Sequence, residues 1–252
     1  MKTRGTAANY HVLSIIESCA RQGIHRKELL SLVGLTEQSL AQPYERQSEE
    51  TVLNLWQAAE QLSGNKMLPF YVGSMSTRMQ RSAITTVLET AETLGAALEV
   101  GIRYQHLTQN IVKSYLYYDI NYGHMIIDNN GLDRELARPQ IERQLAFVVS
   151  LAKNLCIEET GVFSGVEAQF KGKPKVDIVD YENILGIPVK FHCENDQLLF
   201  PLKVMNRRNF SACGEVQASM LLVAQQHERE LLHGLGMRSQ VRQLIADSLG
   251  HS

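Results

Sequence analysis

The chain has 252 residues, of which 44% are hydrophobic and 21% charged, a composition typical of globular proteins. This composition excludes a disordered, collagen-like or coiled-coil chain. Because 25 basic and 27 acidic residues give a net charge of −2, any surface for nucleic acid would have to be local. No apolar stretch is long enough to span a membrane and no signal-peptide pattern opens the chain, so we expect a cytoplasmic protein.

The four cysteines predict neither a disulfide framework nor a structural zinc site. They are Cys19, Cys156, Cys193 and Cys213, and no two of them form a C-x-x-C pair. We therefore expect reduced, mostly buried thiols.

The clearest helix is predicted between Ser48 and Gly64. Ser48 suits the N-cap, and Gly64 follows the last apolar position as a C-cap does. Upstream, two short apolar runs around Gly34 resemble a helix-turn-helix. Residues 36–39 of the second run include no Arg or Lys, which usually read base edges, so we interpret the runs as two packed helices.

Residues 93–107 predict an amphipathic helix that Thr93 caps. Gln105 falls inside its apolar arc, next to Tyr104. A polar side chain in that position needs a hydrogen-bond partner. The partner is either a core group or a ligand, and the pattern leaves both interpretations open.

A hairpin is predicted around a turn at residues 121–123, with Gly123 at a positive φ. On its first strand Tyr115 and Tyr117 share one face. We expect these two rings to face inward as walls of a pocket, because tyrosine offers an apolar surface and a hydroxyl. A tyrosine-rich core with a solvated rim is the alternative.

A long helix is predicted from Pro139, at the first helical position, to Cys156. Its apolar stripe places Arg143 on the opposite, solvent-facing side, so Arg143 is not expected to contact a ligand. Arg138 and Gln144 lie nearer to the inside. A buried guanidinium without a carboxylate partner is costly, so Arg138 would make a ligand anionic or zwitterionic.

The next segments alternate between strand and helix. GVEAQF predicts a strand, VDIVDYENILG a helix, and PVKFHC with QLLFP a second hairpin around residues 194–196. Together the elements predict an α+β fold with a helical N-terminal half, a small mostly antiparallel sheet with flanking helices, and a long C-terminal helix.

That last helix is predicted from Ser211 to Leu235. Its apolar spacing alternates between three and four residues, which suits packing on its own domain or on a second subunit. The candidate dimerisation residues of this seam are Leu221, Ala224, Glu228, Leu231 and Leu235.

Five stretches stand in a characteristic order between Leu29 and Arg208. They are LLSLVGL, SEETVLNLWQAAEQLSGN, TLGAALEVGIRYQHLT, FSGVEAQFKGKPK and DYENILGIPVKFHCENDQLLFPLKVMNRR. Each motif is weak alone, but five in register are hard to obtain by chance. Together they resemble the N-terminal effector domain of AraC/XylS-type transcription regulators, in the subgroup related to ornithine-utilisation regulators.

The resemblance implies a regulatory domain that binds a small-molecule effector and forms a homodimer, with no enzyme activity and no membrane partner. It implies an effector-binding domain over residues 1–210, a dimerisation helix over 211–235 and a linker over 236–252. DNA binding would belong to a C-terminal domain with two helix-turn-helix motifs, and we expect that domain to be absent from this chain.

A small-molecule enzyme is the alternative, with a polar pocket that contains His106, His192 or Cys193. The chain has no G-x-S-x-G, Walker-type, H-E-x-x-H or G-x-G-x-x-G motif, and we expect no catalytic residue, metal or cofactor. The effector site is predicted between the helix that begins at Thr93, the first strand of the hairpin and the start of the Pro139 helix. Its candidate ligand-binding residues are Gln105, Tyr104, Tyr115, Tyr117, Arg138 and Gln144.

Overall fold

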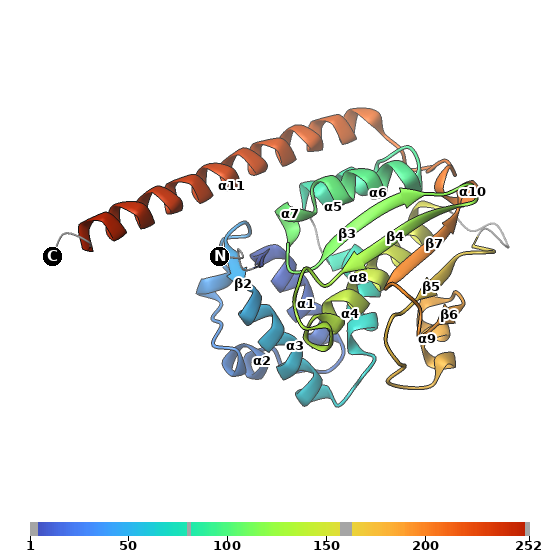
Figure 1. The fold of residues 1–252 in the computed structure, drawn as a ribbon, viewed down its shortest axis with the longest axis horizontal. Coiled ribbons are helices and arrows are strands. Elements are labelled where there is room, and N and C mark those ends of the chain that lie inside the picture. The colour runs from blue at the N-terminus through green and yellow to red at the C-terminus, as the bar shows by residue number, and fades with distance from the viewer. Residues whose placement is uncertain (1–4, 80–81, 157–162, 250–252) are drawn as a thin grey trace.

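The computed structural model describes residues 5–79, 82–156 and 163–249. The fold is α+β, with a helical N-terminal half, two small sheets and a long C-terminal helix, as the sequence predicts (Figure 1). None of the helices in the described ranges combines the length and the apolar character needed to cross a membrane.

The N-terminal half packs around one apolar cluster that includes Ile15, Leu55 and Trp56. Its elements are β1 (Thr6–Ala8), α1 (Asn9–Arg21), α2 (Arg26–Leu32), η1 (Gln38–Leu40), β2 (Arg46–Ser48), α3 (Glu49–Ser63) and α4 (Leu68–Met79). Helix α3 confirms both predicted caps. Ser48 accepts a hydrogen bond from the backbone N–H of Thr51, and Gly64 ends the helix at a φ of 62°.

The run before Gly34 forms helix α2, but the run after it forms only the single 3-10 turn η1, so the interpretation of two packed helices is wrong for the second run.

The second half packs around a larger cluster, which brings the helices against a five-stranded sheet. Its first elements are α5 (Ala83–Glu89), α6 (Leu94–Arg103), α7 (Gln105–Thr108), β3 (Lys113–Tyr118), β4 (Tyr122–Asp128) and α8 (Arg134–Leu155). They are followed by β5 (Glu167–Gln169), α9 (Ile178–Leu185), β6 (Val189–Lys190), β7 (Gln197–Pro201), α10 (Leu202–Met205) and α11 (Gly214–Leu249).

The predicted second hairpin is wrong. The strand order is β3-β4-β7-β5-β6, so β5 lies between β6 and β7. Helix α9 connects β5 to β6 as a crossover, and such a connection returns the chain parallel to the strand it left. Residues 194–196 therefore lead from one edge of the sheet to its interior and form no hairpin turn.

The first hairpin forms, but its turn lies earlier than predicted. Asp119 accepts hydrogen bonds from the backbone N–H groups of Asn121 and Tyr122, both at 2.7 Å, and so closes the turn. Gly123 belongs to β4 and does not have a positive φ. A Cβ there would lie 3.0 Å from the Met205 side chain, so the glycine serves close packing.

Two helix boundaries also differ from the prediction. Helix α8 begins at Arg134, because Asp133 caps it by accepting hydrogen bonds from the N–H groups of Glu135 and Leu136, and Pro139 lies inside the helix. The predicted helix 93–107 is divided at Tyr104 into α6 and α7. Thr93 caps α6 as predicted.

Helix α11 lies along α5 and α7 and extends well past the body of the molecule (Figure 1). It continues to Leu249 through Gly234 and Gly236, because glycines weaken a helix without necessarily ending it. The predicted dimerisation seam contacts its own domain: Ala224 is fully buried, and Leu221 and Leu231 pack against the core. The side chain of Leu235 lies outside the described residues.

Candidate functional site

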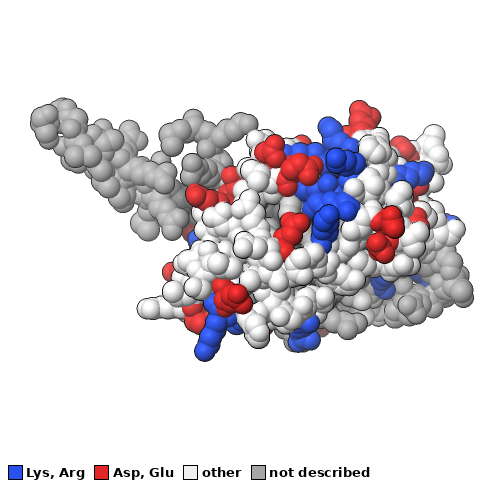
Figure 2. Space-filling view, turned by 90° about the horizontal axis from the view of Figure 1, so that it is seen from below, with Lys and Arg blue, Asp and Glu red and all other residues white. Residues whose placement is uncertain are grey.

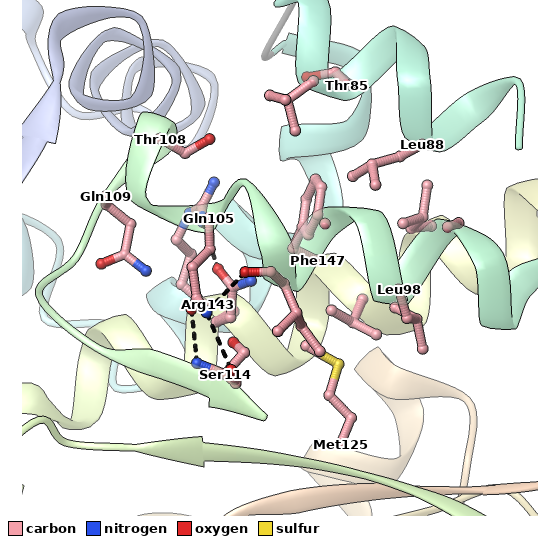
Figure 3. Close-up of a pocket in the computed structure, with 17 residues that line it drawn as sticks. Thr85, Leu88, Leu98, Gln105, Thr108, Gln109, Ser114, Met125, Arg143 and Phe147 are labelled. Carbon is pink, nitrogen blue, oxygen red and sulfur yellow. Dashed lines mark hydrogen bonds between the residues drawn. The ribbon is translucent and has the colours of Figure 1, made fainter. Parts of the chain in front are cut away.

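A cavity of about 60 Å³ lies between helices α5, α6, α7 and α8 and the first two strands of the large sheet. Helices α5 and α6 line it on one side, and α8 with β3 on the other (Figure 3). The described residues that line it are Ile84, Thr85, Leu88, Ala97, Leu98, Gly101, Ile102, Gln105, Thr108, Gln109, Ser114, Met125, Arg143, Gln144, Phe147, Val148 and Leu151.

Gln105 lines the cavity and joins α7 to β3. Its side-chain oxygen accepts a hydrogen bond from the backbone N–H of Ser114 at 2.7 Å. Its side-chain nitrogen donates to the carbonyl oxygens of Ser114 at 3.1 Å and Ile102 at 3.0 Å. The amide therefore acts as a clamp on the cavity wall, and the dashed lines of Figure 3 show it bonded to Ser114.

Gln109 and Thr108 complete the polar wall at the end of α7. Gln109 accepts from the N–H groups of Ile111 and Val112 and donates to the carbonyl of Val112. The Thr108 hydroxyl lies 2.9 Å from the hydroxyl of Tyr10. These bonds hold the wall in place without a ligand.

Arg143 is buried at this cavity, with 1% of its surface exposed, so the prediction that it faces solvent is wrong. One guanidinium nitrogen donates to the Gln144 side chain at 3.3 Å, and the group lies 5.7 Å from the ring centre of Phe147. Burial lowers the pKa of Arg143 to about 9, because the surroundings penalise the charged form. The guanidinium still carries its charge at neutral pH.

The position of Arg143 follows from the place of α8 in the molecule. Packed by α4, the sheet and other helices, α8 is buried on nearly all sides and has no solvent face. Phe147 and Leu151 follow Arg143 at four-residue steps, and both are apolar. That run of apolar residues on the supposed polar face is the sequence signal that indicates a helix buried all round.

Arg138 does not reach the cavity, although it is buried. Its guanidinium donates to Glu142 at 2.7 Å and to the carbonyl of Lys173 at 2.9 Å. Glu142 also lies 3.4 Å from the ammonium of Lys175 and is 1% exposed. Burial raises the pKa of its carboxyl group and outweighs the two cations, which lower it. Arg138 thus has its carboxylate partner within its own helix.

The tyrosines that were expected as walls lie elsewhere. Tyr115 is 50% and Tyr117 46% exposed, so the expectation that they face inward is wrong. Gln105 fixes β3 so that Ser114 points inward, and the alternation of a strand then turns both rings outward. Tyr117 stacks on His124 with ring centres 4.3 Å apart. Tyr104 is buried but does not line the cavity.

Of the six candidate ligand contacts, the structure therefore brings Gln105 and Gln144 to the cavity. The residues of the alternative enzyme site lie apart. His106 lies on α7, near edge strand β3, and pairs with Glu228 of α11 at 3.0 Å. His192 and Cys193 follow β6, the strand at the other edge of the sheet. No group of three His, Cys, Asp or Glu side chains in the described ranges is arranged to hold a metal ion.

The fold and the cavity together define an α+β domain with an internal site of small-molecule size. The family model of the arabinose-binding domain of AraC transcription regulators, N-terminal, matches residues 23–209, and the chain belongs to this family. No curated protein matches the chain significantly.

A crystal structure of the transcriptional regulator CdpR from Pseudomonas aeruginosa is similar in fold, with a TM-score of 0.52 and 13% sequence identity. The match covers 78% of this chain and 60% of the CdpR chain, so this chain spans less than two thirds of that regulator's length.

Proposed function

We propose that this domain senses a small anionic or zwitterionic effector in the cavity beside Arg143, as the regulatory part of an AraC-type transcription regulator. One observation carries the proposal: a charged guanidinium is buried at the wall of a largely apolar cavity. An anion bound there would accept charge-assisted hydrogen bonds from the guanidinium. The family membership supports a ligand-binding role for the same region.

The position of α11 supports a sensing role. Helix α5 lines the cavity with Ile84 and Leu88, and on its other side the carbonyl of Val87 accepts a hydrogen bond from the Gln217 side chain of α11. Helix α7 likewise lines the cavity and contacts Glu228 of α11 through His106. A ligand that displaces either helix would therefore change how α11 is held.

Thermal unfolding with a metabolite library tests the proposal. A ligand present at one hundred times its dissociation constant should stabilise the chain by about 2.7 kcal/mol. In the variant Gly101→Leu the new side chain would occupy the cavity beside Leu88, so the stabilisation should be lost. A ligand that stabilises the variant equally binds elsewhere and contradicts the proposal.

We further propose that the chain forms a homodimer in solution, as the sequence resemblance implies. Since Leu221 and Ala224 contact their own domain, a second copy would have to use the side of α11 that carries Leu222, which is 66% exposed. Sedimentation velocity of the wild type and of Leu222→Glu tests this. A monomeric wild type would contradict the homodimer.

A further inference from the structure

The cavity has two chemically different ends. Thr108, Gln109, Gln105 and Ser114 gather at one end with Arg143 (Figure 3). The opposite end is mostly apolar: Leu88, Leu98, Met125 and Phe147 lie there, beside Thr85 (Figure 3). Val148 and Leu151 also line the cavity. A ligand that fits both ends has a single polar head and an apolar body.

Most of the amide oxygens at the polar end already bind protein groups. The side-chain oxygens of Gln105, Gln109 and Gln144 already accept hydrogen bonds from protein N–H groups. Ser114 differs, because its hydroxyl is buried and makes no hydrogen bond in the described part of the chain. A hydroxyl that lines a cavity without a partner is a free donor for a ligand oxygen.

The charge at the cavity favours a ligand of negative charge. Arg143 is the single charged residue among the described residues that line it, and no Asp or Glu is among them. An ammonium group on the ligand would be desolvated beside this cation, and none of the described lining residues offers it a carboxylate. A second carboxylate would have to lie in the apolar end. Both considerations disfavour zwitterions and dianions.

We propose that the ligand is a short monocarboxylate with an uncharged apolar body, its carboxylate held by the Arg143 guanidinium and the Ser114 hydroxyl. This class is narrower than the anionic or zwitterionic effector and rests on the proposed function. The size of the cavity limits the body: about 60 Å³ corresponds to roughly four to six water-sized groups.

Calorimetric titration of the whole chain with three ligand series tests the class. The probes are linear carboxylates from acetate to octanoate, the matching primary alcohols and the matching alkylammonium ions. We expect the carboxylates to bind, with affinity rising roughly fourfold per methylene until the cavity is filled near pentanoate. The alcohols should bind at least tenfold more weakly, and the alkylammonium ions should not bind.

Four variants test whether the carboxylate of the ligand binds at Arg143 and Ser114. Arg143→Met should reduce pentanoate affinity at least tenfold and reverse the preference between pentanoate and 1-pentanol. Ser114→Ala, the milder change, should weaken pentanoate severalfold and leave the circular dichroism spectrum unchanged. Arg103→Met removes an exposed positive charge at the end of α6 and should bind as the wild type does. Gly101→Leu should abolish binding of every probe.

The outcomes separate the two proposals. If alcohols bind as tightly as carboxylates and Gly101→Leu abolishes both, the cavity is a ligand site but the monocarboxylate class is wrong. Pentanoate affinity that survives both Arg143→Met and Ser114→Ala also overturns the class. If no probe from the three series binds and no metabolite stabilises the chain, the proposed function fails as well.

Discussion

At the scale of single residues, Gln105 shows how one side chain serves structure at the wall of a site. Its amide makes three hydrogen bonds with backbone groups of Ser114 and Ile102, in the pattern that a neighbouring strand would supply. The core and ligand interpretations left open by the sequence are therefore not exclusive. Gln105 shapes the cavity while its own polar atoms are occupied.

Gln105→Leu should lower the free energy of unfolding by roughly 1–3 kcal/mol, because it leaves the N–H and carbonyl of Ser114 without their partner. Urea unfolding followed by circular dichroism measures the change. Tyr115→Ser is a suitable control, since that ring is half exposed and its loss should cost little. Equal stability of Gln105→Leu and the wild type would contradict the clamp.

The four thiols should react with a thiol reagent in the order of their exposure. Cys213 is exposed and Cys193 partly so, whereas Cys19 and Cys156 are buried. Burial raises the pKa of Cys19 to about 12 and also raises that of Cys156, which removes the reactive thiolate. At pH 8 we expect rapid labelling of Cys213, slower labelling of Cys193, and labelling of the other two only in denaturant. Mass spectrometry after proteolysis distinguishes the sites.

At the scale of elements, the close packing of α4 on α8 sets the position of Arg143. Gly73 of α4 lies against the carbonyl of Arg143, where a Cβ would be only 2.3 Å from the oxygen. Because that oxygen belongs to the backbone of a central helix, it cannot move aside cheaply.

Gly73→Ala should therefore destabilise the chain by roughly 1–3 kcal/mol or more and disturb ligand binding at Arg143. Gly234→Ala is the matched control, since Gly234 is also in a helix but has no atom within 4 Å of the added Cβ. The control should be unchanged or slightly more stable, because alanine favours helix. If Gly73→Ala unfolds at the same temperature as the wild type, α4 and α8 can move apart without cost.

The contact of α11 with the body is tested at Ala224, which is fully buried. Ala224→Glu should cost on the order of 3 kcal/mol or release α11, because an uncompensated carboxylate would be buried. Val216→Glu places the same charge at a 41% exposed position of the same helix and should be nearly neutral. Limited proteolysis measures release, and equal protection of α11 in both variants would contradict the contact.

At the scale of the whole molecule, charge is spread without a strong excess of one sign. The net charge is −2, and on the face that Figure 2 shows, acidic side chains flank the largest group of basic side chains. Such a surface gives little of the phosphate attraction on which DNA affinity depends.

We therefore expect this chain alone not to bind DNA sequence-specifically. Titration against the promoter of its own gene at physiological salt, compared with scrambled DNA of equal length, measures this. A sequence-dependent dissociation constant below about 10⁻⁷ M would contradict the prediction, because non-specific binding lies nearer 10⁻⁴ to 10⁻⁶ M.

Local signals in the sequence determined much of this protein by themselves. The caps of α3 and α6, the α+β class and the long C-terminal helix follow from residue types and spacing, because caps and periodicity depend on neighbours within a few positions. The family resemblance likewise rests on ordered stretches of sequence, and the family model confirms it.

Only the tertiary structure decided which faces are buried and which strands pair. Arg143 is internal because other elements surround α8 on nearly every side, and a helical wheel assumes one solvent face. The apolar spacing of the predicted seam in α11 is the same whether the helix packs on its own domain or on a second copy. Strand β6 joins β5 rather than β7 because of a crossover, and such long-range choices leave no trace in local spacing.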